Sequence, residues 1–159
     1  MAEETLGNWD AAKFDYQWVL KRDPQNASAL YNLGNVMAAQ NNWMQSKVLF
    51  DKAFLAKPDF VMARSSKALA CYQLNQFDEA EKELRAVIRK YPLFADSRAA
   101  LSALLWRQGF TGEAESHWAA VAGLDNRYRQ KDWLMMIRRW PPLATNDLMA
   151  FLKLEARST

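Results

Sequence analysis

The sequence is poor in the residues that mark several classes of protein. It has one cysteine, Cys71, so no disulfide can form within the chain, and burial of apolar groups has to hold the fold together. Glycine and proline number five each among 159 residues, which suits long helices better than strands joined by tight turns. No run approaches the roughly 18 apolar residues of a membrane span. We therefore expect a soluble, helical chain.

Signals for targeting and for nucleic-acid binding are also weak. The first residues lack the basic and apolar blocks of a signal peptide. The net charge is only +3, with acids and bases interspersed along most of the chain, which is too mild to argue for nucleic acid by itself. By contrast, half of the residues are hydrophobic, which excludes a disordered composition.

Residues suited to catalysis are scarce. The single histidine, His117, stands alone on a predicted helix, without the partners of a catalytic triad or a metal site. Cys71 falls where a packed apolar residue is expected, which favours a core thiol over a nucleophile. The sequence has no phosphate-binding GxxxxGK[ST] loop, no GxGxxG, no HExxH and no CxxC motif. We therefore predict a protein that is not an enzyme and that needs no metal and no cofactor.

What the sequence does contain is a repeat. Prolines stand at positions 24, 58 and 92, each 34 residues after the last, and a shift by this period also aligns other columns. One column holds only small residues and the column four residues later only large ones; their members are Ala12, Ser46, Ala80 and Ala114, and Tyr16, Phe50, Leu84 and Trp118. Small side chains let two helices approach closely, and the large side chain one turn later fills the space beside them. The period therefore predicts a stack of helix pairs.

The predicted helices span about 8–22, 27–40, 43–56, 60–74, 77–90, 94–107 and 111–123, followed by 129–139 and 145–155. They group into a half-repeat at 7–24 and full repeats at about 27–58, 61–92 and 95–126 within a repeat domain of residues 1–126. Residues 127–159 would form C-terminal capping helices and a tail, covering the apolar face that the end of such a stack exposes.

The best-formed unit reads Leu30-x-x-Leu33-Gly34-x-x-Met37, followed by Ser46-x-x-x-Phe50, Ala53 and Pro58. This unit resembles the tetratricopeptide-repeat (TPR) signature, and the resemblance covers about residues 7–126. It implies an all-α fold, a right-handed superhelical stack of antiparallel helix pairs, here with a C-terminal helical cap. It also implies a protein–protein interaction module or scaffold.

In TPR proteins the first helix of each pair lines a concave groove that holds a partner polypeptide. Carried over by position, the resemblance implies a groove formed by Ser28, Tyr31, Asn32, Asn35, Met62, Ser65, Leu69, Tyr72, Gln73, Asp96, Trp106 and Arg107. One branch of the family grips the C-terminal carboxylate of a chaperone with Lys, Asn and Arg side chains. Asn35 matches that clamp, but Tyr31 replaces its first Lys and Met62 a later cation, so we expect a partner held by apolar and backbone contacts.

The C-terminal region carries a basic cluster. Arg127, Arg129, Lys131, Arg138 and Arg139 face a single acid, with two tryptophans among them. Such a mixture can bind RNA, an anionic membrane surface or an acidic protein patch. The interpretation we favour is a solvated helix whose tryptophans dock on the preceding repeat.

The N-terminal half-repeat is incomplete, because its first helix would begin before residue 1 and only residues 1–6 would remain of it. The face of helix 8–22 with Ala12, Tyr16 and Val19 therefore lacks its usual partner. We favour a chain cut from a longer protein over a face covered by something else, and either case predicts a homodimer through this end.

A narrower resemblance is carried by residues 91–96, 112–118 and 138–142, which read YPLFAD, GEAESHW and RRWPP. These stretches are similar to TPR proteins of cyanobacteria and plastids, several of which assist biogenesis of thylakoid photosynthetic complexes. The resemblance implies an assembly factor in a plastid (stroma or thylakoid lumen) or a cyanobacterial cell. The alternatives are a helical-repeat RNA-binding protein that uses the basic C-terminal helix, and an architectural subunit that dimerises through the open N-terminal end.

Overall fold

The computed structural model describes residues 8–158, with the side chains of 8–157, and all regular secondary structure in this part of the chain is helical, without a strand. Its helices are α2 (Trp9–Arg22), α3 (Ala27–Ala39), α4 (Trp43–Ala56), α5 (Val61–Gln73), α6 (Phe77–Lys90), α7 (Ala95–Arg107), α8 (Thr111–Ala119), the 3-10 helix η1 (Asn126–Arg129), α9 (Lys131–Met136) and α10 (Pro142–Ser158). The expected remnant of an earlier helix in residues 1–6 lies outside the described residues.

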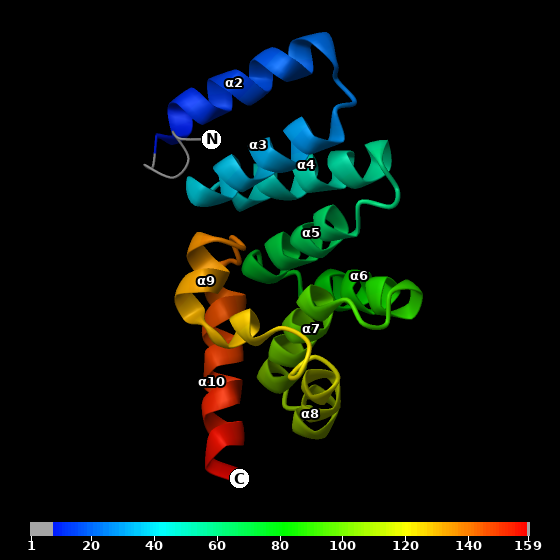
Figure 1. The fold of residues 1–159 in the computed structure, drawn as a ribbon, viewed down its shortest axis with the longest axis vertical. Helices are drawn as coiled ribbons and strands as arrows, with labels where there is room; N and C mark the ends of the chain where they lie inside the picture. Colours follow the sequence, from blue (N-terminus) through cyan, green and yellow to red (C-terminus); the bar gives the residue numbers. More distant parts are fainter. Residues whose placement is uncertain (1–7, 159) are drawn as a thin grey trace.

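Helices α2 to α8 stack in sequence order along the long axis of the molecule (Figure 1). Each helix packs on the next, from α2 on α3 to α7 on α8. The predicted all-α stack of helix pairs is confirmed, and the bounds of the first six predicted helices agree with the structure to within one residue. The helix expected at 111–123 already ends at Ala119, and the one expected at 129–139 spans only Lys131–Met136. The last helix, expected at 145–155, extends three residues further at each end.

The tight turns inside the helix pairs have a common backbone feature. Asn41, Asn75 and Gly109 adopt positive φ angles of 62°, 62° and 90°. These residues occupy equivalent positions of the repeat, and asparagine and glycine tolerate the left-handed conformation that a short turn requires. Asparagines also begin helices, because the side chain of Asn26 accepts a hydrogen bond from the backbone N–H of Ala29 at 2.9 Å.

The small column of the repeat lies in the core, as the period predicts. Its four members, Ala12, Ser46, Ala80 and Ala114, are at most 2% exposed. In the first full pair, the Ser46 hydroxyl donates to the carbonyl oxygen of Gly34 at 2.9 Å. A Cβ atom on Gly34 would stand 2.6 Å from the ring of Phe50, so only glycine allows this close approach of α3 and α4 without a shift.

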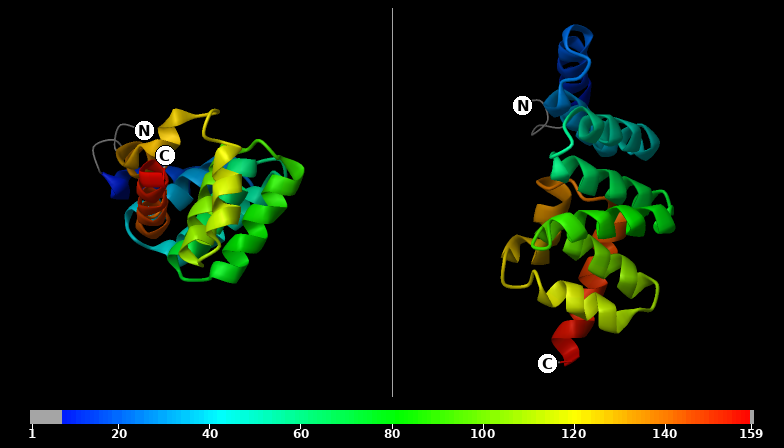
Figure 2. Two further views of the ribbon diagram at one scale, coloured as in Figure 1. Left: turned by 90° about the horizontal axis from the view of Figure 1, so that it is seen from below. Right: turned by 90° about the vertical axis from the view of Figure 1, so that its right-hand side faces the viewer.

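The last part of the chain does not add another pair to the stack. Residues 126–158, which we call the tail, comprise η1, α9 and α10 and lie along one side of it (Figures 1 and 2). Helix α10 packs mainly on α7 and also on α5, and α9 lies beside its beginning. The tail thus covers apolar surface of the last repeats from their inner side. Helix α10 begins at Pro142 because proline is well suited to the first turn, where its missing N–H is not needed.

Candidate functional site

The candidate site is the inner face of the stack, formed by the first helix of each pair, α3, α5 and α7. All the groove residues predicted from the sequence lie on these three helices. The tail covers most of the part of this face that belongs to α5 and α7, and α3 with the beginning of α5 carries the rest. The two parts have different chemistry, so we describe them in turn.

The covered part is centred on Asp96, in the first turn of α7. Its side chain is fully buried and forms an ion pair with Arg138 of the tail, whose side chain is 7% exposed. Two guanidinium nitrogens of Arg138, Nε and Nη2, donate to the two carboxylate oxygens of Asp96, each at 2.7 Å. This paired geometry gives strong, directional hydrogen bonds between a carboxylate and an arginine.

Three further donors complete the contacts of Asp96. Ser65 of α5 donates at 2.5 Å, and Tyr128 and Trp140 of the tail each donate at 2.9 Å. Burial by itself would raise the pKa of Asp96, but the charge and hydrogen bonds of Arg138 outweigh it, so the pKa is lowered. Burial raises the pKa of Tyr128, which keeps its phenol protonated as a donor. The body of the stack thus supplies an anion, and the tail supplies the cation and two of the three neutral donors.

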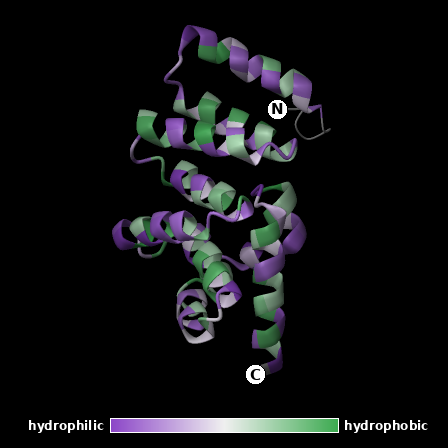
Figure 3. Cartoon of the chain, turned by 180° about the vertical axis from the view of Figure 1, so that it is seen from behind, coloured by the Kyte–Doolittle hydropathy of each residue, from purple (hydrophilic) through white to green (hydrophobic). Residues whose placement is uncertain are grey.

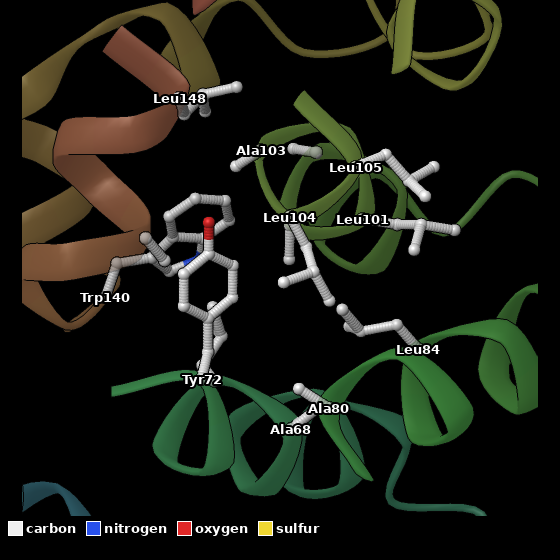
Figure 4. Close-up of a cluster of buried hydrophobic side chains, with 14 of the residues drawn as sticks. Ala68, Tyr72, Ala80, Leu84, Leu101, Ala103, Leu104, Leu105, Trp140 and Leu148 are labelled. Atoms are coloured by element: carbon white, nitrogen blue, oxygen red, sulfur yellow. The ribbon is translucent and has the colours of Figure 1, made fainter. Parts of the chain in front are cut away.

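A second polar contact joins α10 to the stack. The hydroxyl of Tyr72 donates to Asp147 at 2.6 Å, and Arg107 donates to the same carboxylate at 3.2 Å. The Tyr72 ring lies beside Trp140, between α5 and the tail (Figure 4). Burial is the main cause that raises the pKa of Tyr72, so this residue is also a phenol donor. The side chain of Gln73 accepts a hydrogen bond from the backbone N–H of Leu143 at 3.0 Å.

Of the predicted groove residues, five therefore bind the tail or support its binding through polar contacts: Ser65, Tyr72, Gln73, Asp96 and Arg107. Leu69 is buried in the same cluster, and Trp106 packs against it. The sequence assigned Asp96 to the groove and Arg138 to a basic patch, but the structure brings them together. An acid and a base 42 residues apart give no local pattern, so sequence reasoning missed the pair.

The part of the inner face that belongs to α3 and the beginning of α5 is more open. Ser28 is exposed, and Tyr31, Asn32, Asn35 and Met62 are half-buried. Tyr31 packs against Phe50 and Phe60, with ring centroids 5.5 and 5.0 Å apart.

A hollow of about 210 Å³ lies where the end of α3 faces the tail. Its lining is mostly apolar and consists of Trp9, Ala38, Ala39, Asn41, Trp43, Met135, Met136, Arg139, Trp140 and Pro142. Met136 is 63% exposed, so apolar surface is available at this place.

The predicted basic residues do not share one exposed surface. Arg138 is buried in its ion pair with Asp96, so it does not contribute to an exposed patch. The other three arginines each lie over a tryptophan ring: Arg127 over Trp133, Arg129 over Trp118 and Arg139 over Trp9. Arg127 also pairs with Asp125 at 2.8 Å, and Lys131 is exposed. The arginines thus contact several different parts of the molecule.

The comparison that decides the family is with profiles of known families. The tetratricopeptide-repeat profile matches three overlapping stretches, residues 1–44, 38–93 and 66–128, which together cover most of the chain. The chain belongs to the tetratricopeptide-repeat family. The TPR resemblance read from residues 30–58 is therefore confirmed.

Known proteins with similar sequence or structure agree with this assignment. The TPR repeat-containing thioredoxin TTL4 of Arabidopsis thaliana is 31% identical over 84 residues, which are 53% of this chain but only 12% of that protein. Among solved structures, MamA superposes with a TM-score of 0.68 at 19% identity, over 99% of this chain and 94% of MamA. YrrB, a TPR protein with an unusual peptide-binding site, gives a TM-score of 0.65 at 19% identity, covering 99% of this chain and 88% of YrrB. At these identities the structural likeness concerns the fold.

His117 and Cys71, the two residues considered for catalysis, both pack against other parts of the protein. His117 lies 3.0 Å from Arg98 and 3.6 Å from Glu113, and burial followed by the charge of Arg98 lowers its pKa. Cys71 is buried, which raises its thiol pKa to about 11. As the chain's single cysteine, it cannot form the dithiol pair of a thioredoxin-type site.

Residues 8–158 hold no group of three or more His, Cys, Asp or Glu side chains that could bind a metal ion. None of the helices described is both long and apolar enough to cross a membrane. Hydrophilic residues interrupt the apolar ones along α10, the longest of them (Figure 3).

Proposed function

We propose that this TPR chain is a protein-binding scaffold whose inner face holds a polypeptide segment of a partner. One observation carries the proposal: the inner face already holds a polypeptide, its own tail, through buried and directional side-chain contacts centred on Asp96. A stack that binds one segment along part of its inner face can bind another segment along the part that the tail leaves open. The peptide-binding site of YrrB, on the same fold, supports this use of the stack.

The partner would occupy the open part of the inner face, on α3 and the beginning of α5. Its contact residues would be Ser28, Tyr31, Asn32, Asn35 and Met62. The amide of Asn35 can both donate to and accept from a peptide backbone. Tyr31 adds a flat apolar ring with a polar end, a type of side chain that often dominates binding energy. Because this surface carries few charges, the partner segment would be held by apolar and backbone contacts.

The identity of the partner is a finer proposal. Residues 91–96, 112–118 and 138–142 are similar to TPR proteins of cyanobacteria and plastids, which supports a role as an assembly factor for photosynthetic (thylakoid) complexes. The corresponding location would be a plastid or a cyanobacterial cell. Co-purification with subunits of such a complex, lost when the α3 surface is altered, would support this role. Co-purification that survives the change would contradict it.

Of the two alternative functions, the N-terminal interface has a specific observation in its favour. Phe14 and Trp18 of α2 are 67% and 51% exposed, and they line an apolar hollow of about 430 Å³. Exposed aromatic surface of this kind favours an interface with another chain or repeat. The RNA-binding alternative has less support, because four of the five predicted basic residues make intramolecular contacts.

The proposed peptide surface can be tested with the purified full chain. Short random peptides displayed on phage are selected for binding, and the affinity of each selected peptide is measured by fluorescence anisotropy. The combined change Tyr31→Ala and Asn35→Ala should weaken binding by about tenfold or more, because it removes an aromatic anchor and a backbone-binding amide.

The matched control is Asn146→Ala, which removes an exposed asparagine side chain from α10. This variant should bind the selected peptides as the unchanged protein does. If no peptide is selected, or if the selected peptides bind the Tyr31 and Asn35 variant with unchanged affinity, the proposed surface is refuted.

A further inference from the structure

In the covered part of the inner face, the stack supplies the negative charge and the tail supplies the positive charge. The stack contributes the carboxylate of Asp96 and the hydroxyls of Ser65 and Ser66, and the tail contributes the guanidinium of Arg138. Without the tail, Asp96 would keep only Ser65 among its observed donors. The uncovered face would therefore present an anion that needs a guanidinium to satisfy it.

The indole of Trp140 also contributes to the contact between the tail and the inner face. The Trp140 ring is buried, and its Nε1–H donates to the same carboxylate oxygen of Asp96 that Arg138 Nε reaches. Arginine and tryptophan stand two residues apart in the tail, so one short segment fills both the charged and the apolar parts of the face. The chemistry that recognises the tail is thus an arginine with an aromatic residue two positions later.

The tail shares a buried apolar cluster with α5 and α7, but it is not part of the contacts between consecutive helices of the stack. Consecutive helices from α2 to α8 pack on one another through the repeat columns, which do not involve residues 126–158. The tail follows α8 through residues 120–125, which include Gly123. Arg139, between the two recognition residues, has a φ of 65°, a conformation that costs free energy for a residue with a Cβ atom. If the tail leaves, the contacts between consecutive helices from α2 to α8 remain, and the apolar residues of α5 and α7 that Leu134, Leu148 and Phe151 cover are exposed until a partner segment covers them.

We propose that the tail is an exchangeable occupant of the inner face, and that a partner segment with an arginine and an aromatic residue two positions later competes with it for Asp96. The inference rests on the proposed function only in treating the inner face as a polypeptide-binding surface. It assigns a second, covered site on α5 and α7, distinct from the open surface on α3. A partner gains access to this site when the tail is displaced.

The test uses a fluorescein-labelled synthetic peptide with the sequence of residues 126–143 and the full chain as the receptor. The unchanged protein should bind the peptide weakly, because the tethered tail competes at a high effective concentration. Arg138→Ala removes the guanidinium from the tail and leaves the receptor residues of the stack intact. This variant should bind the peptide about tenfold or more tightly than the unchanged protein does.

Two controls separate specific exchange from general loosening. Arg127→Ala removes an exposed arginine from the same tail and should leave peptide affinity unchanged. A second peptide, with alanine in place of the arginine equivalent to Arg138, should not bind the Arg138→Ala protein. Equal affinity of the unchanged and Arg138→Ala proteins for the first peptide, or equal binding of the two peptides, would overturn the proposal.

Hydrogen exchange of the unchanged protein provides a test that does not depend on a variant. The backbone N–H groups of Trp140 and Leu143 donate to Leu134 and Gln73 in the docked tail. They should exchange through opening of the tail, faster than amides in the middle of α5 and α7. Exchange of both groups only at the rate of global unfolding would overturn the proposal.

The two proposals fail in different ways. If library peptides require Asn35 but the tail peptide does not gain affinity when Arg138 is removed, the proposed function stands and the exchange of the tail is refuted. If the tail peptide binds as expected but no library peptide depends on Asn35, the open surface is refuted and the covered site stands.

Discussion

The close approach of α3 and α4 at Gly34 leads to a prediction with a built-in control. Gly34→Ala places a Cβ atom 2.6 Å from the ring of Phe50, which is 2% exposed and packs against Tyr31. Replacing glycine by alanine inside a helix normally gains about 1 kcal/mol. Forcing an extra carbon into a packed interior costs about 1–3 kcal/mol. The net effect should be a loss of about 0–2 kcal/mol in the free energy of unfolding.

The control is Gly112→Ala, in the first turn of α8. A Cβ atom there would meet no other atom within 4 Å, so this change should stabilise the protein by about 0.4–1 kcal/mol. Both variants share the gain in helix propensity, so the difference between them isolates the clash. Urea unfolding followed by far-UV circular dichroism should place the Gly34 variant about 1–3 kcal/mol below the Gly112 variant.

A second change identifies the atoms responsible. Phe50→Leu removes the ring edge that the new Cβ atom would meet. The cost of Gly34→Ala should therefore be smaller in the Phe50→Leu background than in the unchanged protein. If Gly34→Ala stabilises the protein as much as Gly112→Ala does, or if its cost is the same with leucine at position 50, the reasoning about this contact is refuted.

Three further predictions concern ionisable groups. The pKa of His117, the single histidine, should lie below its usual value of 6.5 because of burial and the charge of Arg98. An NMR titration measures this pKa, and the change Arg98→Ala should raise it. An unshifted pKa would contradict the reasoning. The folded pKa of Asp96 is lowered, so this residue should contribute stability that is present above about pH 4 and is lost as the pH falls through the folded pKa. Urea unfolding at several acidic pH values tests this, and a slope that Asp96→Asn leaves unchanged would argue against it. The thiol of Cys71, buried and with its pKa raised to about 11, should react with a disulfide reagent at neutral pH only when the protein unfolds; rapid reaction of the native protein would exclude the buried position.

Much of the stack could be predicted from the sequence, because the residue patterns that specify each helix pair are local and recur in every repeat. Small residues at one position and large ones four later specify a close helix pair, whatever the rest of the chain does. Residues such as Asn41 and Asn75 mark the turns in the same way, through a backbone conformation that few residues tolerate. The period then repeats each local signal, so that one weak match is supported by the others.

The groove was predicted less completely, because a segment distant in sequence, the tail, decides which groove residues a partner can reach. Periodicity places Tyr72 and Asp96 on the inner face correctly, but it does not say what lies on top of them. Their partners, Asp147 and Arg138, come from a part of the chain outside the repeat. The tail does not repeat, so its sequence offers no pattern from which its docking position on the stack could be predicted.

Helical geometry and the period of 34 residues suffice to specify the repeat, the helix pairs and which side chains of the repeats face inward. The tertiary structure alone decided that the tail turns back along α7 and α5 and that Arg138 neutralises Asp96. The physical reason is that burial of a charge costs much free energy unless a counter-charge and hydrogen bonds accompany it. That pairing is a property of three-dimensional proximity, and no spacing along the chain encodes it.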